Sequence, residues 1–113
     1  MMDTKEKLEL ALKYDSGYVL ALSNLARVYG VYGEDFAKRA DEEKKNNHFG
    51  QEKQNKQVAD ESFNKAVFYY LRAIKADPKY ISSYRMLGLA YHKLGDEQNA
   101  AYYLSIYEKM KGK

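Results

Sequence analysis

The side chains of this chain that are best suited to bind metal ions or transfer protons belong to two histidines and one acidic run. Imidazole and carboxylate groups bind metal ions and transfer protons, and His48, His92 and the run Asp41-Glu42-Glu43 supply both kinds. The histidines are far apart in the sequence, and neither has a second ligand four residues on or carboxylates at zinc spacing. Because Lys44 and Lys45 directly follow the acidic run, we interpret it as a solvated helix face. We therefore expect no metal site.

Catalytic motifs are missing from the sequence as well. The chain has no Cys, and its Ser, His and Asp residues follow no spacing that indicates nucleophilic catalysis. It lacks an EF-hand loop, a phosphate-binding glycine motif and a nucleophile elbow. The sequence therefore predicts a protein that is not an enzyme and that needs no cofactor.

Charge and hydropathy disfavour two classes of partner. The net charge of +3 arises from 19 basic and 16 acidic residues that are mixed along the chain, whereas nucleic-acid-binding proteins usually concentrate a basic excess on one face. The longest apolar run, residues 66–71, is far too short to cross a bilayer, and the N-terminus lacks a signal-peptide pattern. We expect neither a nucleic acid nor a membrane as partner, and a cytoplasmic location.

Long helices must position whatever site the chain has. Its 113 residues include only 7 Gly and 1 Pro, which favours long regular elements over a multi-stranded β fold. The 12 Tyr indicate half-buried seams between helices. The expected helices lie near residues 4–14, 18–32, 34–46, 52–76, 80–94 and 97–111.

An internal repeat becomes visible when the chain is shifted against itself by 62 positions, which places Tyr29 on Tyr91. A small residue also recurs, because Ala26 falls on Gly88. The other identical pairs are Ala11 with Ala73, Lys13 with Lys75, Asp15 with Asp77, Tyr18 with Tyr80, Leu25 with Leu87, and Gly33 with Gly95.

The second copy has the clearer pattern. Residues 84–91 follow an aromatic-x-x-Leu-Gly-x-x-Tyr spacing, Ala100 and Leu104 occupy later small and large positions, and Pro78 precedes the copy. This pattern resembles the tetratricopeptide repeat family, and the resemblance covers about two-thirds of the chain. It implies an all-α array of helical hairpins that stack into a superhelix.

The resemblance also gives individual residues a structural role. Gly88 lets the paired helix approach closely, with Leu87 and Tyr91 filling the space around it. Gly95 is expected to end the first helix of the repeat in a left-handed conformation. Asp96 is expected to cap the helix that follows.

The first repeat contains an insertion. The family period is roughly 34 residues, so a shift of 62 leaves about 28 extra residues, at about Glu34 to Glu61. Three interpretations remain open: both helices of the hairpin are prolonged and meet near residues 46–50, the segment is a flexible polar loop, or it swings out to pair with a second chain. Opposite charges four residues apart, such as Glu34 and Lys38, support the helical interpretation.

The predicted organisation is a single domain over residues 1–113. It consists of a partial leading helix at 3–14, an interrupted repeat at 18–78 with the insertion at about 34–61, and a final repeat at 80–113.

The resemblance implies a concave groove lined by the first helix of each repeat. The expected groove residues combine cations with apolar neighbours, which suits a peptide that carries a carboxylate and an apolar side chain. They are Leu20, Ser23, Asn24, Arg27 and Val31 in the first repeat, and Ser82, Arg85, Leu89, His92 and Lys93 in the second. The carboxylate clamp of some family members is not expected, because Met86 replaces one of its asparagines.

The resulting hypothesis is an adaptor or scaffold module for protein–protein interaction that binds a peptide or partner helix in the groove and also self-associates. Tyr103, Leu104 and Tyr107 form an expected apolar patch that a second copy would cover, giving a homodimer. The alternative is a structural oligomer assembled through swapped or paired long helices, with no separate ligand.

Overall fold

The structure is a computed structural model that describes residues 4–15 and 17–112. Residue 3, where the predicted leading helix starts, lies outside this part. The described residues form five helices and no strand: α1 (Thr4–Tyr14), α2 (Val19–Lys45), α3 (Phe49–Ala76), α4 (Ile81–Lys93) and α5 (Glu97–Lys111). The predicted all-α fold is therefore confirmed.

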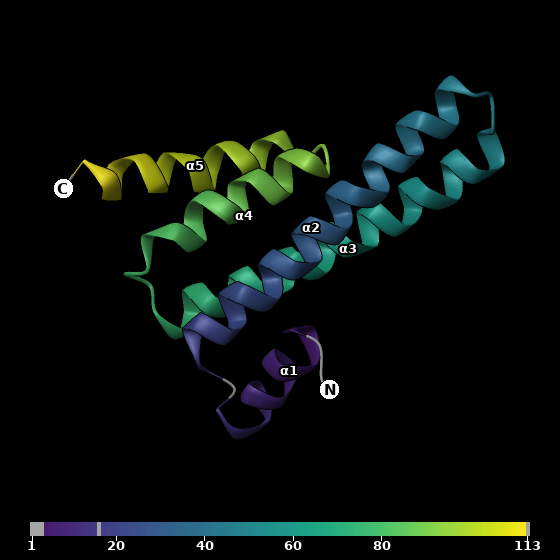
Figure 1. Ribbon diagram of the computed structural model, residues 1–113. Helices are drawn as coiled ribbons and strands as arrows, with labels where there is room; N and C mark the ends of the chain where they lie inside the picture. Colours follow the sequence, from purple (N-terminus) through teal and green to yellow (C-terminus); the bar gives the residue numbers. More distant parts are fainter. Residues whose placement is uncertain (1–3, 16, 113) are drawn as a thin grey trace.

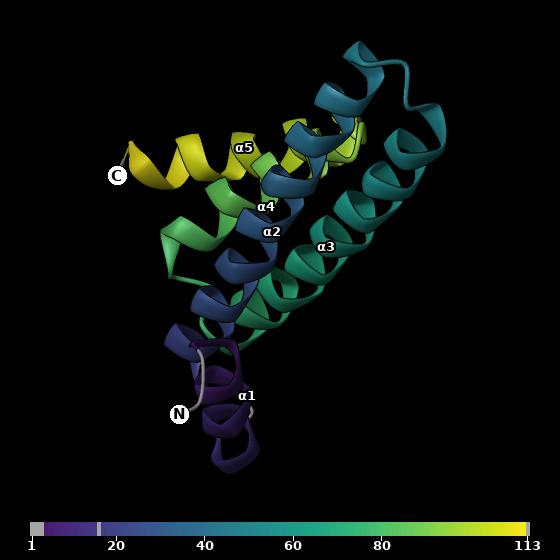
Figure 2. The same cartoon turned by 45° about the vertical axis from the view of Figure 1, so that its right-hand side comes forward.

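Each helix packs mainly on its neighbours in the chain. α2 lies along α3 and α4 lies along α5, so that the four helices form two antiparallel hairpins (Figure 1). α4 packs on α3, and α1 packs on α2. In both views α1 lies at the end of the α2–α3 hairpin that is remote from the turn joining α2 to α3 (Figure 2). The arrangement is a row of helical hairpins preceded by one helix.

The insertion prolongs the first hairpin. α2 has 27 residues and α3 has 28, which corresponds to roughly 40 Å each. Residues 34–61, which we call the arm, are therefore helical on both sides of a short turn. The arm projects beyond the turn that joins α4 to α5 (Figure 1). This path agrees with the first of the three interpretations.

The predicted helix boundary at Gly33 was wrong. α2 passes straight through this residue, because the segment that follows is rich in Glu, Lys, Arg and Ala, which are good helix formers. Gly33 is buried where α2 meets α3, and a Cβ atom there would lie 2.7 Å from the ring of Phe63. Gly33 thus permits close packing, whereas its counterpart Gly95 has a φ of 81° and ends a hairpin's first helix as expected.

The arm closes through a short turn inside the predicted segment 46–50. Asn47 has a φ of 61°, and the backbone N–H of His48 donates to the carbonyl oxygen of Glu43 at 2.8 Å. The expected ion pair between Glu34 and Lys38 is not among those of the described residues.

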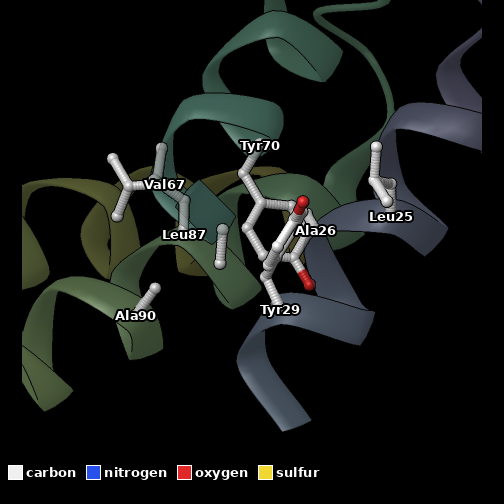
Figure 3. Packing of buried hydrophobic residues seen from close by; sticks show 8 residues of the cluster. Leu25, Ala26, Tyr29, Val67, Tyr70, Leu87 and Ala90 are labelled. Carbon is white, nitrogen blue, oxygen red and sulfur yellow. The ribbon is translucent and has the colours of Figure 1, made fainter. Parts of the chain in front are cut away.

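The core lies between α2, α3 and α4. Its buried cluster consists of Leu25, Ala26 and Tyr29 from α2, Ala66, Val67 and Tyr70 from α3, and Leu87 and Ala90 from α4. Figure 3 shows these side chains gathered between the three helices. The core therefore joins the first hairpin to the second.

The small residues predicted to permit close packing are buried. Ala26 is fully buried, and a Cβ atom on Gly88 would lie 2.6 Å from Cγ of Leu104. The predicted cap also forms, because a side-chain oxygen of Asp96 accepts a hydrogen bond from the backbone N–H of Asn99 at 3.2 Å. Both hairpins thus bury a small residue at the position where the sequence predicts close packing.

Candidate binding groove

Two adjoining hollows lie along α2 and α4 on one side of the molecule. Their volumes are about 280 Å³ and about 180 Å³. Arg27, Tyr70 and Met86 line both hollows, so the two are continuous. We call the larger one the apolar cleft, the smaller one the polar cleft, and the two together the groove.

The apolar cleft is lined mainly by carbon. Val31 and Leu89 stand on its rim, where 57% and 37% of their surfaces are exposed. Charged groups mark its edges. The lining is Arg27, Gly30, Val31, Glu34, Phe63, Ala66, Tyr70, Met86, Leu89, Ala90 and Lys93. Such a surface suits an apolar side chain flanked by charge.

The polar cleft has hydroxyl groups without hydrogen-bond partners. Ser23 and Ser83 line it, and their Oγ atoms are buried without a hydrogen-bond partner among the described residues. Ser83 is only 1% exposed. An unpaired buried hydroxyl costs about 1–3 kcal/mol, whereas the side chains of Asn24, Arg27 and Ser82 are exposed and accessible to a ligand. The lining is completed by Asn24, Arg27, Tyr70, Tyr80, Ser82 and Met86.

The helical-hairpin fold agrees with a family match for one segment of the chain. The sequence profile of the tetratricopeptide repeat family matches residues 69–102. The chain contains a tetratricopeptide repeat. The match begins near the end of α3 and includes all of α4. No curated protein matches the chain.

The tetratricopeptide repeat indicates a protein–protein interaction module of a family that is generally not catalytic. Among the described residues, no three or more His, Cys, Asp and Glu side chains lie close enough together to hold a metal ion. None of the described helices combines the length and the apolar character that a membrane span requires.

The structure brings most of the predicted groove residues together. The seven that line the two clefts are Ser23, Asn24, Arg27, Val31, Ser82, Leu89 and Lys93. Leu20, Arg85 and His92 do not line them. Arg85 is exposed beside the sulfur of Met86, and His92 hydrogen-bonds to Glu97 at 2.9 Å.

The prediction from the sequence did not include several residues that line the groove. Phe63 and Tyr70 come from α3, whereas the family resemblance implies a groove lined by the first helix of each repeat. Ser83 is buried, and a serine on the inner face of a predicted helix was the signal that could have revealed it.

Tyr70 is held in its neutral form in the groove. Burial raises the pKa of its hydroxyl to about 12, and the charge of nearby Arg27 opposes this shift. The phenol therefore keeps its proton near neutral pH and is able to donate a hydrogen bond. Burial also raises the pKa of Tyr69, Tyr91 and Tyr103.

Both histidines contact a carboxylate near a hairpin turn. Nδ1 of His48 lies 2.7 Å from Glu43 at the tip of the arm, and Nδ1 of His92 lies 2.9 Å from Glu97 at the turn between α4 and α5. Each pair links two segments of its own hairpin.

The residues of the predicted self-association patch lie largely within the second hairpin. Tyr103 stacks on Tyr91 with ring centroids 5.7 Å apart, and Leu104 packs beneath Gly88. Tyr107 is half-buried with Lys111 over its ring. They are less exposed than expected because α4 and α5 are joined by a tight turn and pack closely. Self-association through them stays a prediction.

Proposed function

We propose that this chain is an adaptor module that binds a peptide or a partner helix in the groove along α2 and α4. The exposed side chains of Asn24, Arg27 and Ser82 carry the proposal, because all three line the same surface cleft and donate hydrogen bonds. A side-chain or backbone carbonyl, or a carboxylate, would accept from all three groups.

The adjoining apolar cleft gives the ligand a second requirement. Val31, Leu89 and Met86 offer exposed or half-exposed apolar surface next to the hydrogen-bonding groups. An apolar side chain placed there would leave water while its neighbouring acceptor reaches the polar cleft. We therefore expect ligands in which an apolar residue lies close to an acidic residue or a free carboxyl terminus.

Selection from a random peptide library on the immobilised protein tests this proposal. Selected peptides should share an apolar and an acidic position, and Arg27→Glu should weaken their binding by at least about tenfold, since a charged hydrogen bond is replaced by repulsion. The matched control is Arg39→Glu, on the exposed part of the arm. Equal binding by the wild-type protein and the Arg27→Glu variant would refute the groove assignment.

A second function is proposed for the arm: assembly of an oligomer through paired or swapped long helices. Its support is the length of the arm and the exposure of Phe49 near its tip, which leaves 60% of this aromatic residue in solvent. Light scattering over a range of concentrations measures this directly. A dimer that dissociates on Phe49→Ser supports it, and a monomer at all concentrations contradicts it.

A further inference from the structure

Three of the aromatic rings that pack together on the face of α2 and α3 next to α1 form a cluster of stacked and edge-to-face pairs, and Tyr32 adds a further edge contact to Tyr29 at 6.5 Å. Tyr29 stacks on Tyr69 with centroids 5.8 Å apart and planes at 2°. Phe68 meets Tyr69 edge to face at 5.1 Å. Tyr29 lies two positions from Arg27 and from Val31, about 200° around α2. The cluster therefore faces away from the groove.

The second hairpin contains the same cluster. Tyr91 stacks on Tyr103 at 5.7 Å, and Tyr102 meets Tyr103 edge to face at 4.9 Å. Tyr102 and Tyr103 follow Phe68 and Tyr69 by 34 positions, the period of the repeat. The aromatic cluster is thus a structural feature that both hairpins share.

The two clusters differ in their charged neighbours. In the first, Nζ of Lys65 lies 5.3 Å from the ring centroid of Tyr29, and the Arg72 guanidinium lies 5.6 Å from that of Phe68. The equivalent positions in the second hairpin are Asn99 and Ile106. Among the described residues, no cation lies over a ring of the second cluster, so Lys65 and Arg72 are not needed to build the first.

The first cluster borders a hollow of about 680 Å³ between α1 and α3. Lys13, Lys65 and Arg72 line it, and its single carboxylate among the described lining residues is Glu9, which lies 3.8 Å from Nζ of Lys5. The Glu9 charge is therefore offset, and Lys13 and Lys65 by themselves leave the hollow a positive excess. Phe68 presents an exposed ring there, with 55% of its surface in solvent.

We propose that this hollow is a second docking site, distinct from the groove, for an acidic polypeptide segment that carries an aromatic side chain. Carboxylates would pair with Lys13, Lys65 and Arg72, and an aromatic ring would pack on Phe68. A cationic ligand is disfavoured by the same charges. The mixed charge of the chain as a whole favours a polypeptide over a nucleic acid.

Fluorescently labelled random copolymers provide the probe. The copolymer of glutamate and tyrosine should bind more tightly than polyglutamate, because only the former supplies aromatic rings. The variant Lys65→Asn plus Arg72→Ile gives the first hairpin the residues of the second. It should retain its circular dichroism spectrum and lose at least about tenfold in copolymer affinity.

Matched variants separate the contributions. Arg39→Ile plus Lys44→Asn removes the same charge from the arm and should change copolymer affinity by less than about twofold. Phe68→Ala should abolish the preference for the copolymer over polyglutamate, whereas Tyr102→Ala, at the equivalent position of the second hairpin, should preserve it. In the Arg27→Glu variant, whose groove is impaired, the remaining copolymer binding should still depend on Lys65 and Arg72, which distinguishes this site from the groove.

Three results would overturn the proposal. The first is equal copolymer affinity of the wild-type protein and the Lys65→Asn plus Arg72→Ile variant. The second is an equal loss in the arm control, which would indicate unspecific charge attraction. The third is tighter binding of polyuridylic acid than of the copolymer, with the same dependence on Lys65 and Arg72, which would make the hollow a nucleic-acid site.

Discussion

The two glycines in the middle of α2 have opposite surroundings. A Cβ atom on Gly33 would lie 2.7 Å from the Phe63 ring, whereas one on Gly30 would have no neighbour within 4 Å. Gly33→Ala should lower the free energy of unfolding by about 1–2 kcal/mol, since the clash outweighs the gain in helix propensity. Gly30→Ala should raise it by about 0.5–1 kcal/mol, because only the propensity changes. Urea unfolding followed by circular dichroism measures both.

The double variant Gly33→Ala plus Phe63→Leu provides the control for this pair. A smaller side chain at position 63 leaves room for the added methyl group, so the penalty of Gly33→Ala should shrink in that background. Stabilisation by Gly33→Ala in the wild-type background would contradict the close approach of α2 and α3 at this point.

At the scale of the helices, the hairpin pattern was predictable and one boundary was not. The 62-residue shift located Leu25 and Leu87 in equivalent places, and both are fully buried in the core. The pattern failed at Gly33 because glycine serves both as a helix terminator and as a contact residue. The helix-forming residues after Gly33 suit either a continuous helix or the start of a new one, so they do not separate these roles. The difference depends on Phe63, which is 30 positions away in the chain.

The groove residues, like the helices, were predictable only in part. Residues on the first helices, such as Arg27 and Leu89, follow from the family resemblance, which places the groove along these helices. Phe63 and Tyr70 reach the groove from α3, and their positions depend on how α3 packs against α4. Tertiary packing of this kind is set by the whole core and leaves no mark in a local pattern.

The arm has little buried apolar surface for its length. The buried residues of the arm are small, namely Ala40 on α2 and Ala59 on α3. Residues 62–73 of α3, outside the arm, contribute the larger Phe63, Val67 and Tyr70 to the interior. Amides of residues 38–58 should therefore exchange with deuterium at least about tenfold faster than those of residues 66–73. Mass spectrometry of peptic fragments measures the gradient. Uniform protection along α3 would show that the arm is stabilised by something beyond these contacts.

The hairpins of the whole molecule share one core and should unfold together. Leu87 from α4 is fully buried among α2 and α3 residues such as Leu25 and Val67, so it links the second hairpin to the first. Leu87→Ala should lower the free energy of unfolding by about 2–5 kcal/mol. The unfolding transitions followed by tyrosine fluorescence and by helicity should still coincide at one urea concentration.

Leu104 provides the comparison, because it packs on Gly88 within the second hairpin and does not belong to the shared core. Leu104→Ala should loosen the α4–α5 contact while the core between α2 and α3 keeps its packing. Fluorescence of the many tyrosines should then change before most of the helicity is lost. If Leu87→Ala gave the same separation of the two signals, the hairpins would be independent units, and nearest-neighbour coupling through α4 would be refuted.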